Sequence, residues 1–250
     1  MLTVIVLMSG SDAPFQEAGY AYPKNLIEIS GVPLVQRVIE GLSSIDGPDT
    51  RIVCVIPKAE NRRHHTGRVI ELLRPGTRIV EVNAATGGAA CTALLAVEHI
   101  ERDQPLLIVN GDIVIEHPLD GVLADFSARR LDGGVTVFRD VHPRWSFVKL
   151  DDEDLAVEFA EKRPISNLAT TGFSWFARGG DFVDFTSSML LKDGHVDGVF
   201  YVAPVFNELI LSSRRVGAYP IPKSAYFSLK APKDVRDYEN FLVARRDRAA

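Results

Sequence analysis

Short apolar runs alternate with helix-like patterns along the first half of the chain, and this alternation constrains the fold more than any other feature. The expected strands are Thr3–Met8, Arg51–Ile56, Arg78–Val82 and Pro105–Asn110, and the expected helices are Pro33–Leu42, Gly67–Leu73 and Ala89–Ile100. Strands that alternate with helices are typical of a doubly wound sheet. Ligands in such sheets bind beyond the carboxyl ends of the strands.

The second half is richer in strands and has few crossover helices, which predicts antiparallel additions to the sheet. The expected strands are Gly133–Phe138, Phe147–Leu150, Ala156–Phe159, Thr171–Ala177 and Arg215–Pro220, with helices at Asp181–Leu190, Ala203–Leu211 and Pro232–Arg246. No linker rich in Gly, Pro or Ser interrupts the chain, so we expect one domain spanning residues 1–250.

Charge and composition exclude several classes of protein. The formal net charge is -5 and no block of five or more basic residues occurs, so nucleic acid is not an expected partner. The first apolar run is too short to span a membrane and lacks a basic leader, so we expect a cytoplasmic protein without a membrane partner. The apolar stripe over Val202–Leu211 could serve a homodimer contact.

Two stretches near the N-terminus could bind phosphate. The loop after the first strand consists of small residues, whose backbone N–H groups can approach phosphates, although it could equally be a simple turn. Lys24 follows a proline and is a positioned point charge suited to a phosphate oxygen, although surface lysines are common. The loop residues concerned are Ser9, Gly10, Ser11 and Asp12.

Two further stretches lie later in the first half. Thr86, Gly87 and Gly88 precede a helix. Glycines at a helix start leave backbone N–H donors uncovered and let the flat ring of a ligand approach the backbone. They could instead allow tight packing between the helix and a strand. Asn110-Gly111-Asp112 ends a buried strand, where a carboxylate is well placed to hold Mg²⁺ together with phosphates, or could merely cap the next element.

In this order and spacing, these stretches resemble the sugar-phosphate nucleotidyltransferases over most of the chain. The matching segments are Tyr22–Pro33, Thr86–Thr92, Gly111-Asp112, Glu161–Pro164 and Thr171–Phe173. Gly19-Tyr20, His142–Ser146 and Ala203–Leu209 further resemble capsule-cluster members, including cytidylyltransferases acting on phosphoglutamine. The resemblance implies a three-layer α/β/α, Rossmann-like fold of glycosyltransferase-A type with a mixed, mainly parallel sheet. Residues 1–115 would form the nucleotide-binding half and residues 116–250 the acceptor-binding half.

The resemblance also implies an activity and its residues. A nucleoside triphosphate, expected to be CTP, UTP or dTTP, would react with a sugar phosphate or related small phosphate, releasing pyrophosphate in nucleotide-sugar or surface polysaccharide biosynthesis. Lys24, Asp112 and Lys162 would be catalytic, and Mg²⁺ would bind Asp112. Ser228 stands at the position of the family's second metal aspartate. The implied acceptor-binding residues are Arg144, Glu161, Gly172 and Asn207.

Several positions depart from the family pattern. The phosphate loop usually reads Gly-x-Gly-x-Arg, but here Asp12 replaces the second glycine and Pro14 replaces the arginine. The family's late Gly-Thr-Pro reads Lys230-Ala231-Pro232. A degenerate protein that binds a nucleotide or nucleotide sugar without transferring it is therefore one alternative. A glycosyltransferase is the other, although the Asp-x-Asp motif usual in those enzymes is replaced by Asn110-Gly111-Asp112.

Overall fold

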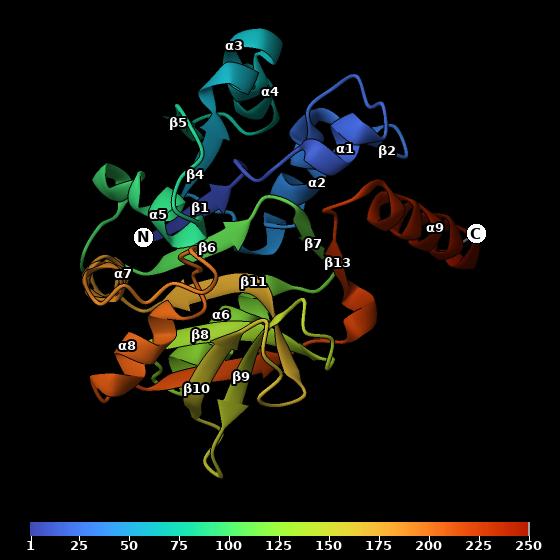
Figure 1. The fold of residues 1–250 in the computed structure, drawn as a ribbon. Helices are drawn as coiled ribbons and strands as arrows, with labels where there is room; N and C mark the ends of the chain where they lie inside the picture. Colours follow the sequence, from blue (N-terminus) through green and yellow to red (C-terminus); the bar gives the residue numbers. More distant parts are fainter. Residues whose placement is uncertain (250) are drawn as a thin grey trace.

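A nine-stranded mixed sheet forms the centre of the molecule in the computed structural model, which describes residues 1–249 (Figure 1). Its first part is parallel, in the order β5-β4-β1-β6. These strands span Leu2–Leu7 (β1), Thr50–Pro57 (β4), Arg78–Val82 (β5) and Leu106–Asn110 (β6). Strands β1, β4 and β6 are mostly apolar because both faces are covered, as expected for a doubly wound sheet, whereas the edge strand β5 is partly exposed.

The second half of the chain continues the same sheet with antiparallel strands, as expected. Strand β11 (Leu168–Phe176) pairs antiparallel with β8 (Gly133–Arg139) along one side. On its other side it pairs antiparallel with β6 through Phe173–Phe176 and with β9 (Ser146–Leu150) at Ala169. Strand β10 (Ala156–Glu161) extends β9, and β12 (Val216–Pro220) runs parallel to β8. Strand β11 therefore joins the strands that follow residue 115 to the parallel part.

Helices cover both faces of the sheet, which confirms the three-layer α/β architecture (Figure 1). One layer contains α2 (Leu34–Glu40), α4 (Thr66–Leu73), α6 (Leu119–Ala128) and α9 (Pro232–Ala249). The other contains α5 (Ala89–Leu94), α7 (Gly179–Leu191) and α8 (Val205–Leu211). In the second layer Phe206 stacks on Phe159 and Phe176, with ring centroids 5.0 and 4.7 Å apart.

A small antiparallel ribbon lies beyond the end of β6. It consists of β7 (Ile113–Ile115) and β13 (Tyr226–Ser228), and its register places Ser228 opposite Ile113. The remaining elements are α1 (Ala13–Glu17), α3 (Lys58–His64), the two-residue strands β2 (Glu28–Ile29) and β3 (Val32–Pro33), and short 3-10 turns at Lys24–Leu26, Ser43–Ile45, Val97–His99 and Lys223–Ala225. The ribbon brings residues near 228 beside Asp112.

One expectation from the sequence is corrected, and another is narrowed. The helix expected over Ala89–Ile100 ends at Leu94 and is followed by a 3-10 turn. The apolar stripe of 202–211 faces inward, because its residues Val205, Phe206 and Leu209 are fully buried against the sheet. Leu211 at the end of the stripe is 74% exposed, so a homodimer contact there stays a prediction. No helix in the described part of the chain has the length and apolar character needed to cross a membrane.

Candidate active site

The Lys24 ammonium donates a hydrogen bond to Asp112 Oδ2 at 3.0 Å, at the carboxyl ends of β1 and β6. The two side chains are only 4% and 13% exposed, so this ion pair is largely shielded from water. The strands are parallel neighbours, and Leu7 pairs with Asn110, so the segments that follow both strands emerge side by side. Gly10 leaves room for the pair, since a Cβ there would lie 3.0 Å from Lys24 Nζ. The structure thus brings together three residues that the sequence marked separately.

A buried network that sequence reasoning missed holds the Lys24 segment in place. The amide of Asn25 donates to the Met8 carbonyl at 2.9 Å and to both carboxylate oxygens of Glu60 at 3.1 and 3.0 Å. The hydroxyl of Thr66 donates to Glu60 Oε1 at 2.8 Å. Burial raises the pKa of Glu60, against the effect of these hydrogen bonds. The network ties the end of β1 to the segment that presents Lys24.

The loop after β1 carries a carboxylate where the resemblance places a glycine. Asp12 is half-buried, and burial raises the pKa of its carboxyl group while the nearby Lys24 charge opposes that effect. The Ser11 hydroxyl accepts a hydrogen bond from the Ala13 N–H at 3.2 Å. Pro14 lies in the first turn of α1 and contributes no positive charge. The loop itself, residues 9–14, therefore carries no positively charged side chain.

The two glycines before α5 are packed against a distant segment. Gly88 has φ +138°, and a Cβ at this position would lie 2.3 Å from the Phe200 carbonyl oxygen. The Phe200 N–H donates to the Gly87 carbonyl at 2.8 Å, and the Ala90 N–H donates to the Phe200 carbonyl at 3.0 Å. The Thr86 hydroxyl contacts the Thr92 hydroxyl at 2.6 Å. Of the two interpretations left open, tight packing describes Gly88.

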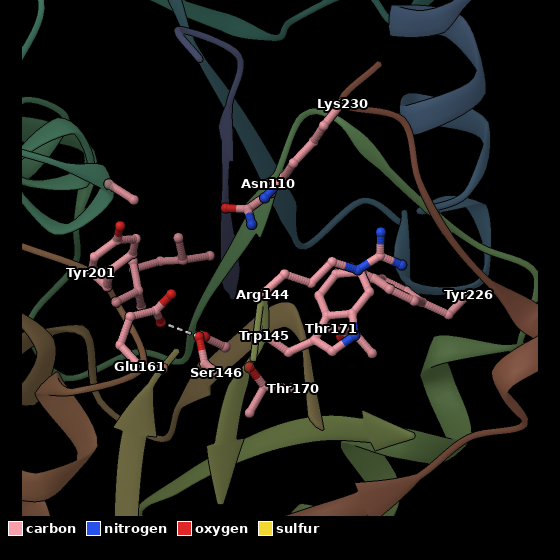
Figure 2. Close-up of a pocket in the computed structure, with 16 residues that line it drawn as sticks. Asn110, Arg144, Trp145, Ser146, Glu161, Thr170, Thr171, Tyr201, Tyr226 and Lys230 are labelled. Carbon is pink, nitrogen blue, oxygen red and sulfur yellow. Dashed lines mark hydrogen bonds between the residues drawn. The ribbon is translucent and has the colours of Figure 1, made fainter. Parts of the chain in front are cut away.

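A pocket extends from Asn110 into the second half of the chain (Figure 2). Gly172 lies against its mouth, because a Cβ on Gly172 would come within 2.4 Å of Asn110 Nδ2. The Arg144 guanidinium stacks over the Trp145 ring, 4.1 Å from its centroid. The lining residues are Ala89, Ile108, Asn110, Arg144, Trp145, Ser146, Glu161, Thr170, Thr171, Gly172, Ser174, Tyr201, Val202, Ala203, Tyr226 and Lys230. Three of the residues marked for acceptor binding, Arg144, Glu161 and Gly172, thus share one pocket.

Glu161 and Lys162 differ in their surroundings. Glu161 lines the pocket and accepts a hydrogen bond from the Ser146 hydroxyl (Figure 2), and burial raises the pKa of its carboxyl group. Lys162 lies outside the lining, 3.6 Å from Asp197 and over the Tyr201 ring. Contact with the Tyr201 hydroxyl raises the pKa of the Lys162 ammonium, which keeps the group positively charged.

Asn207 does not reach this pocket, so its expected place among the acceptor-binding residues is corrected. Its Oδ1 accepts a hydrogen bond from the Phe159 N–H at 2.8 Å, and its Nδ2 donates to the Phe159 carbonyl at 2.9 Å. Both ends of the amide are therefore used to fasten α8 to the edge strand β10.

The donor groups around Asp112 fit a magnesium ion that is shared with a substrate. No group of three or more His, Cys, Asp or Glu side chains in the described part of the chain could hold a metal ion by itself. Mg²⁺ usually binds one or two carboxylates together with substrate phosphates and water. Asp112 provides one carboxylate, and the register of β13 places the Ser228 hydroxyl on the neighbouring strand. An ion here would depend on phosphate oxygens for its remaining ligands.

Comparisons with known proteins identify the family of the chain. The sequence model of the nucleotidyl transferase family matches residues 3–195, and the chain belongs to this family. It is similar to the bifunctional protein GlmU of Methanocaldococcus jannaschii, with 26% identity over 180 residues. That match covers 70% of this chain but only 40% of GlmU.

Solved structures with related folds cover nearly the whole chain. A nucleoside-diphosphate-sugar pyrophosphorylase from Vibrio cholerae RC9 has a TM-score of 0.83 at 22% identity, covering 95% of this chain and 99% of the other. The inositol-1-phosphate CTP transferase from T. maritima has a TM-score of 0.72 at 18% identity, covering 93% and 90%. At these identities the likeness establishes the shared fold.

Proposed function

We propose that this protein transfers a nucleotidyl group from a nucleoside triphosphate to a sugar phosphate or related small phosphate, with release of pyrophosphate. The observation that carries the proposal is the shielded Lys24–Asp112 pair beside Gly10, placed next to a pocket with basic side chains. Family membership supports the same reaction. We expect a pyrimidine triphosphate from the resemblance to cytidylyltransferases.

Each side chain then has a defined task. Lys24 binds a phosphate oxygen of the triphosphate after exchanging its contact with Asp112 for one with the substrate. Asp112 would hold Mg²⁺, which offsets negative charge on the phosphates when bound, and Ser228 stands opposite Ile113 on the adjoining strand. Arg144 and Lys162 bind the phosphate of the acceptor, and Glu161 with Ser146 orients its polar groups.

The reaction needs no covalent intermediate with the protein. An oxygen of the acceptor phosphate attacks the α-phosphorus in line, and the bond from the α-phosphorus to the bridging oxygen breaks. Pyrophosphate leaves with the electron pair, so charge is conserved without a proton transfer from the protein. Positively charged groups fixed in advance stabilise the charge that builds up on the phosphates.

The decisive experiment measures pyrophosphate release from purified protein with Mg²⁺, each common nucleoside triphosphate and a panel of sugar 1-phosphates and small phosphate esters. We expect release that requires one triphosphate and one acceptor together. Asp112→Asn should abolish it, whereas Asp152→Asn, which changes an exposed turn, should not. Full activity of Asp112→Asn would refute the role of Asp112.

A binding protein without turnover is the second candidate, and the observation that favours it is the lack of a cation at Pro14 together with the extra carboxylate of Asp12. Calorimetry distinguishes the two. The folded protein would have to bind a nucleotide sugar and release no pyrophosphate with any substrate pair. That result would establish the second function and exclude the first.

A further inference from the structure

Lys230 lines the pocket although the sequence gave no role to its side chain. It stands where related sequences have the glycine of Gly-Thr-Pro. Its backbone is fixed from both sides: the Leu229 N–H donates to the Asp112 carbonyl at 2.7 Å, and the Lys230 N–H donates to Asp234 Oδ2 at 3.2 Å. Lys230 is thus attached directly to the segment that carries the candidate metal ligand.

The side chain of Lys230 extends toward Asn110, at the junction of the two halves of the site (Figure 2). The ion pairs found in the described part of the chain engage Lys24 and Lys162 but not Lys230. Its positive charge acts on the Glu161 carboxylate across the pocket, where it opposes the pKa increase caused by burial. The ammonium therefore faces the space between the nucleotide loop and the acceptor pocket.

The phosphate loop creates a need for such a charge. Two phosphorylated substrates bring several negative charges together, and Pro14 supplies no guanidinium to bind them. Hydrogen bonds from charged donors to phosphate are stronger than neutral ones, so the absence of a guanidinium there weakens phosphate binding. A lysine that reaches the same phosphates from the opposite wall would replace part of this interaction.

We propose that Lys230 is a catalytic residue that donates hydrogen bonds to the phosphate oxygens where the two substrates meet, replacing the positive charge that Pro14 lacks. This inference rests on the proposed transfer reaction. The oxygen of the acceptor phosphate bonds to the α-phosphorus while the α-phosphorus loses its bond to pyrophosphate, as above. Lys230 contacts the non-bridging oxygens during this exchange and keeps its own protons.

Lys230→Met removes the charge at similar length, and Lys230→Arg keeps it. Lys233→Met is the matched control, because Lys233 is exposed on α9 and pairs only with Asp237 in the described part of the chain. We expect Lys230→Met to lower kcat roughly 10²–10³-fold, the range seen when one donor to a transition-state oxyanion is removed. Lys230→Arg should recover part of this loss, and Lys233→Met should match the wild type. An unchanged kcat in Lys230→Met would overturn the inference.

Binding of inorganic pyrophosphate separates this inference from the proposed function. Pyrophosphate resembles the diphosphate that the reaction would build, and its affinity can be measured by calorimetry with Mg²⁺ even if no substrate pair reacts. Lys230→Met should weaken this binding about tenfold, about 1.4 kcal/mol, whereas Lys233→Met should not. Absent turnover with weakened binding would refute the transfer reaction but keep Lys230 as a phosphate ligand. Equal affinity in both variants would refute the role of Lys230.

Discussion

Replacing Glu60 with alanine would leave buried donors without acceptors. Asn25 Nδ2 would lose both contacts to the carboxylate and keep only the Met8 carbonyl, and the Thr66 hydroxyl would lose its 2.8 Å contact. A buried donor without a partner costs about 1–3 kcal/mol, so two such donors should lower the free energy of unfolding by about 2–5 kcal/mol. Glu60→Gln keeps the volume and one acceptor oxygen, so its loss should be about 1–2 kcal/mol.

Urea unfolding followed by circular dichroism at pH 6 measures both losses. Because Asn25 directly follows Lys24, the folded Glu60→Gln protein should also show a lower kcat, a loss of rate that saturating substrate does not reverse. The exposed substitution Glu153→Gln serves as the control, since its backbone N–H donates to Asp151 Oδ1 and its side chain makes no hydrogen bond to any described residue. A loss below about 1 kcal/mol in Glu60→Ala would refute the claim that this network holds the Lys24 segment.

The raised pKa of Glu60 gives this position a pH dependence of known sign. Burial raises the pKa above its ordinary value of 4.5, so the folded protein binds this proton more tightly than the unfolded chain. The resulting stability is fully present below pH 4.5 and is lost as the pH rises through the raised pKa. The free energy of unfolding of the wild type minus that of Glu60→Gln should therefore decrease from pH 4.5 toward neutrality. A constant difference would contradict the assignment.

Three other substitutions test the fold around the site by urea unfolding. Gly88→Ala places a Cβ 2.3 Å from the Phe200 carbonyl oxygen and should cost about 2–5 kcal/mol; a loss below 1 kcal/mol would show that the two segments do not pack this closely. Phe206→Ala empties the centre of a stack of aromatic rings and should cost about 3–5 kcal/mol, and a much smaller loss would mean that the stack is loose. Asn207→Ala removes both hydrogen bonds to Phe159 and should cost about 1–3 kcal/mol without changing kcat, whereas a specific loss of kcat would return Asn207 to the acceptor site.

The sequence by itself determined the parallel part of the sheet and marked Lys24 and Asp112 as candidate site residues. Strands such as β1 and β6 are continuous apolar runs because both of their faces are covered, and this pattern is readable without a structure. Asp112 directly follows one such strand and Lys24 lies beyond the loop that follows the other. The carboxyl ends of parallel strands meet at one edge of a sheet, so a site there could be predicted.

Helices α3 and α6 were not predicted. Helix α3 is short and mostly charged, and its one buried residue is Glu60, so it shows no apolar periodicity. A buried glutamate has no signature in a sequence, because it is stable only where partners such as Asn25 and Thr66 are brought to it by the fold.

Only the tertiary structure decided which polar side chains face the site. The contact of Lys24 with Asp112 joins residues 88 positions apart, and the ribbon of β7 and β13 brings Lys230 beside Asp112 from near the end of the chain. Helix α8 directs the Asn207 amide away from the pocket and toward the backbone of β10. Residue type and spacing describe what a side chain can bind, but the pairing of distant strands fixes what it meets.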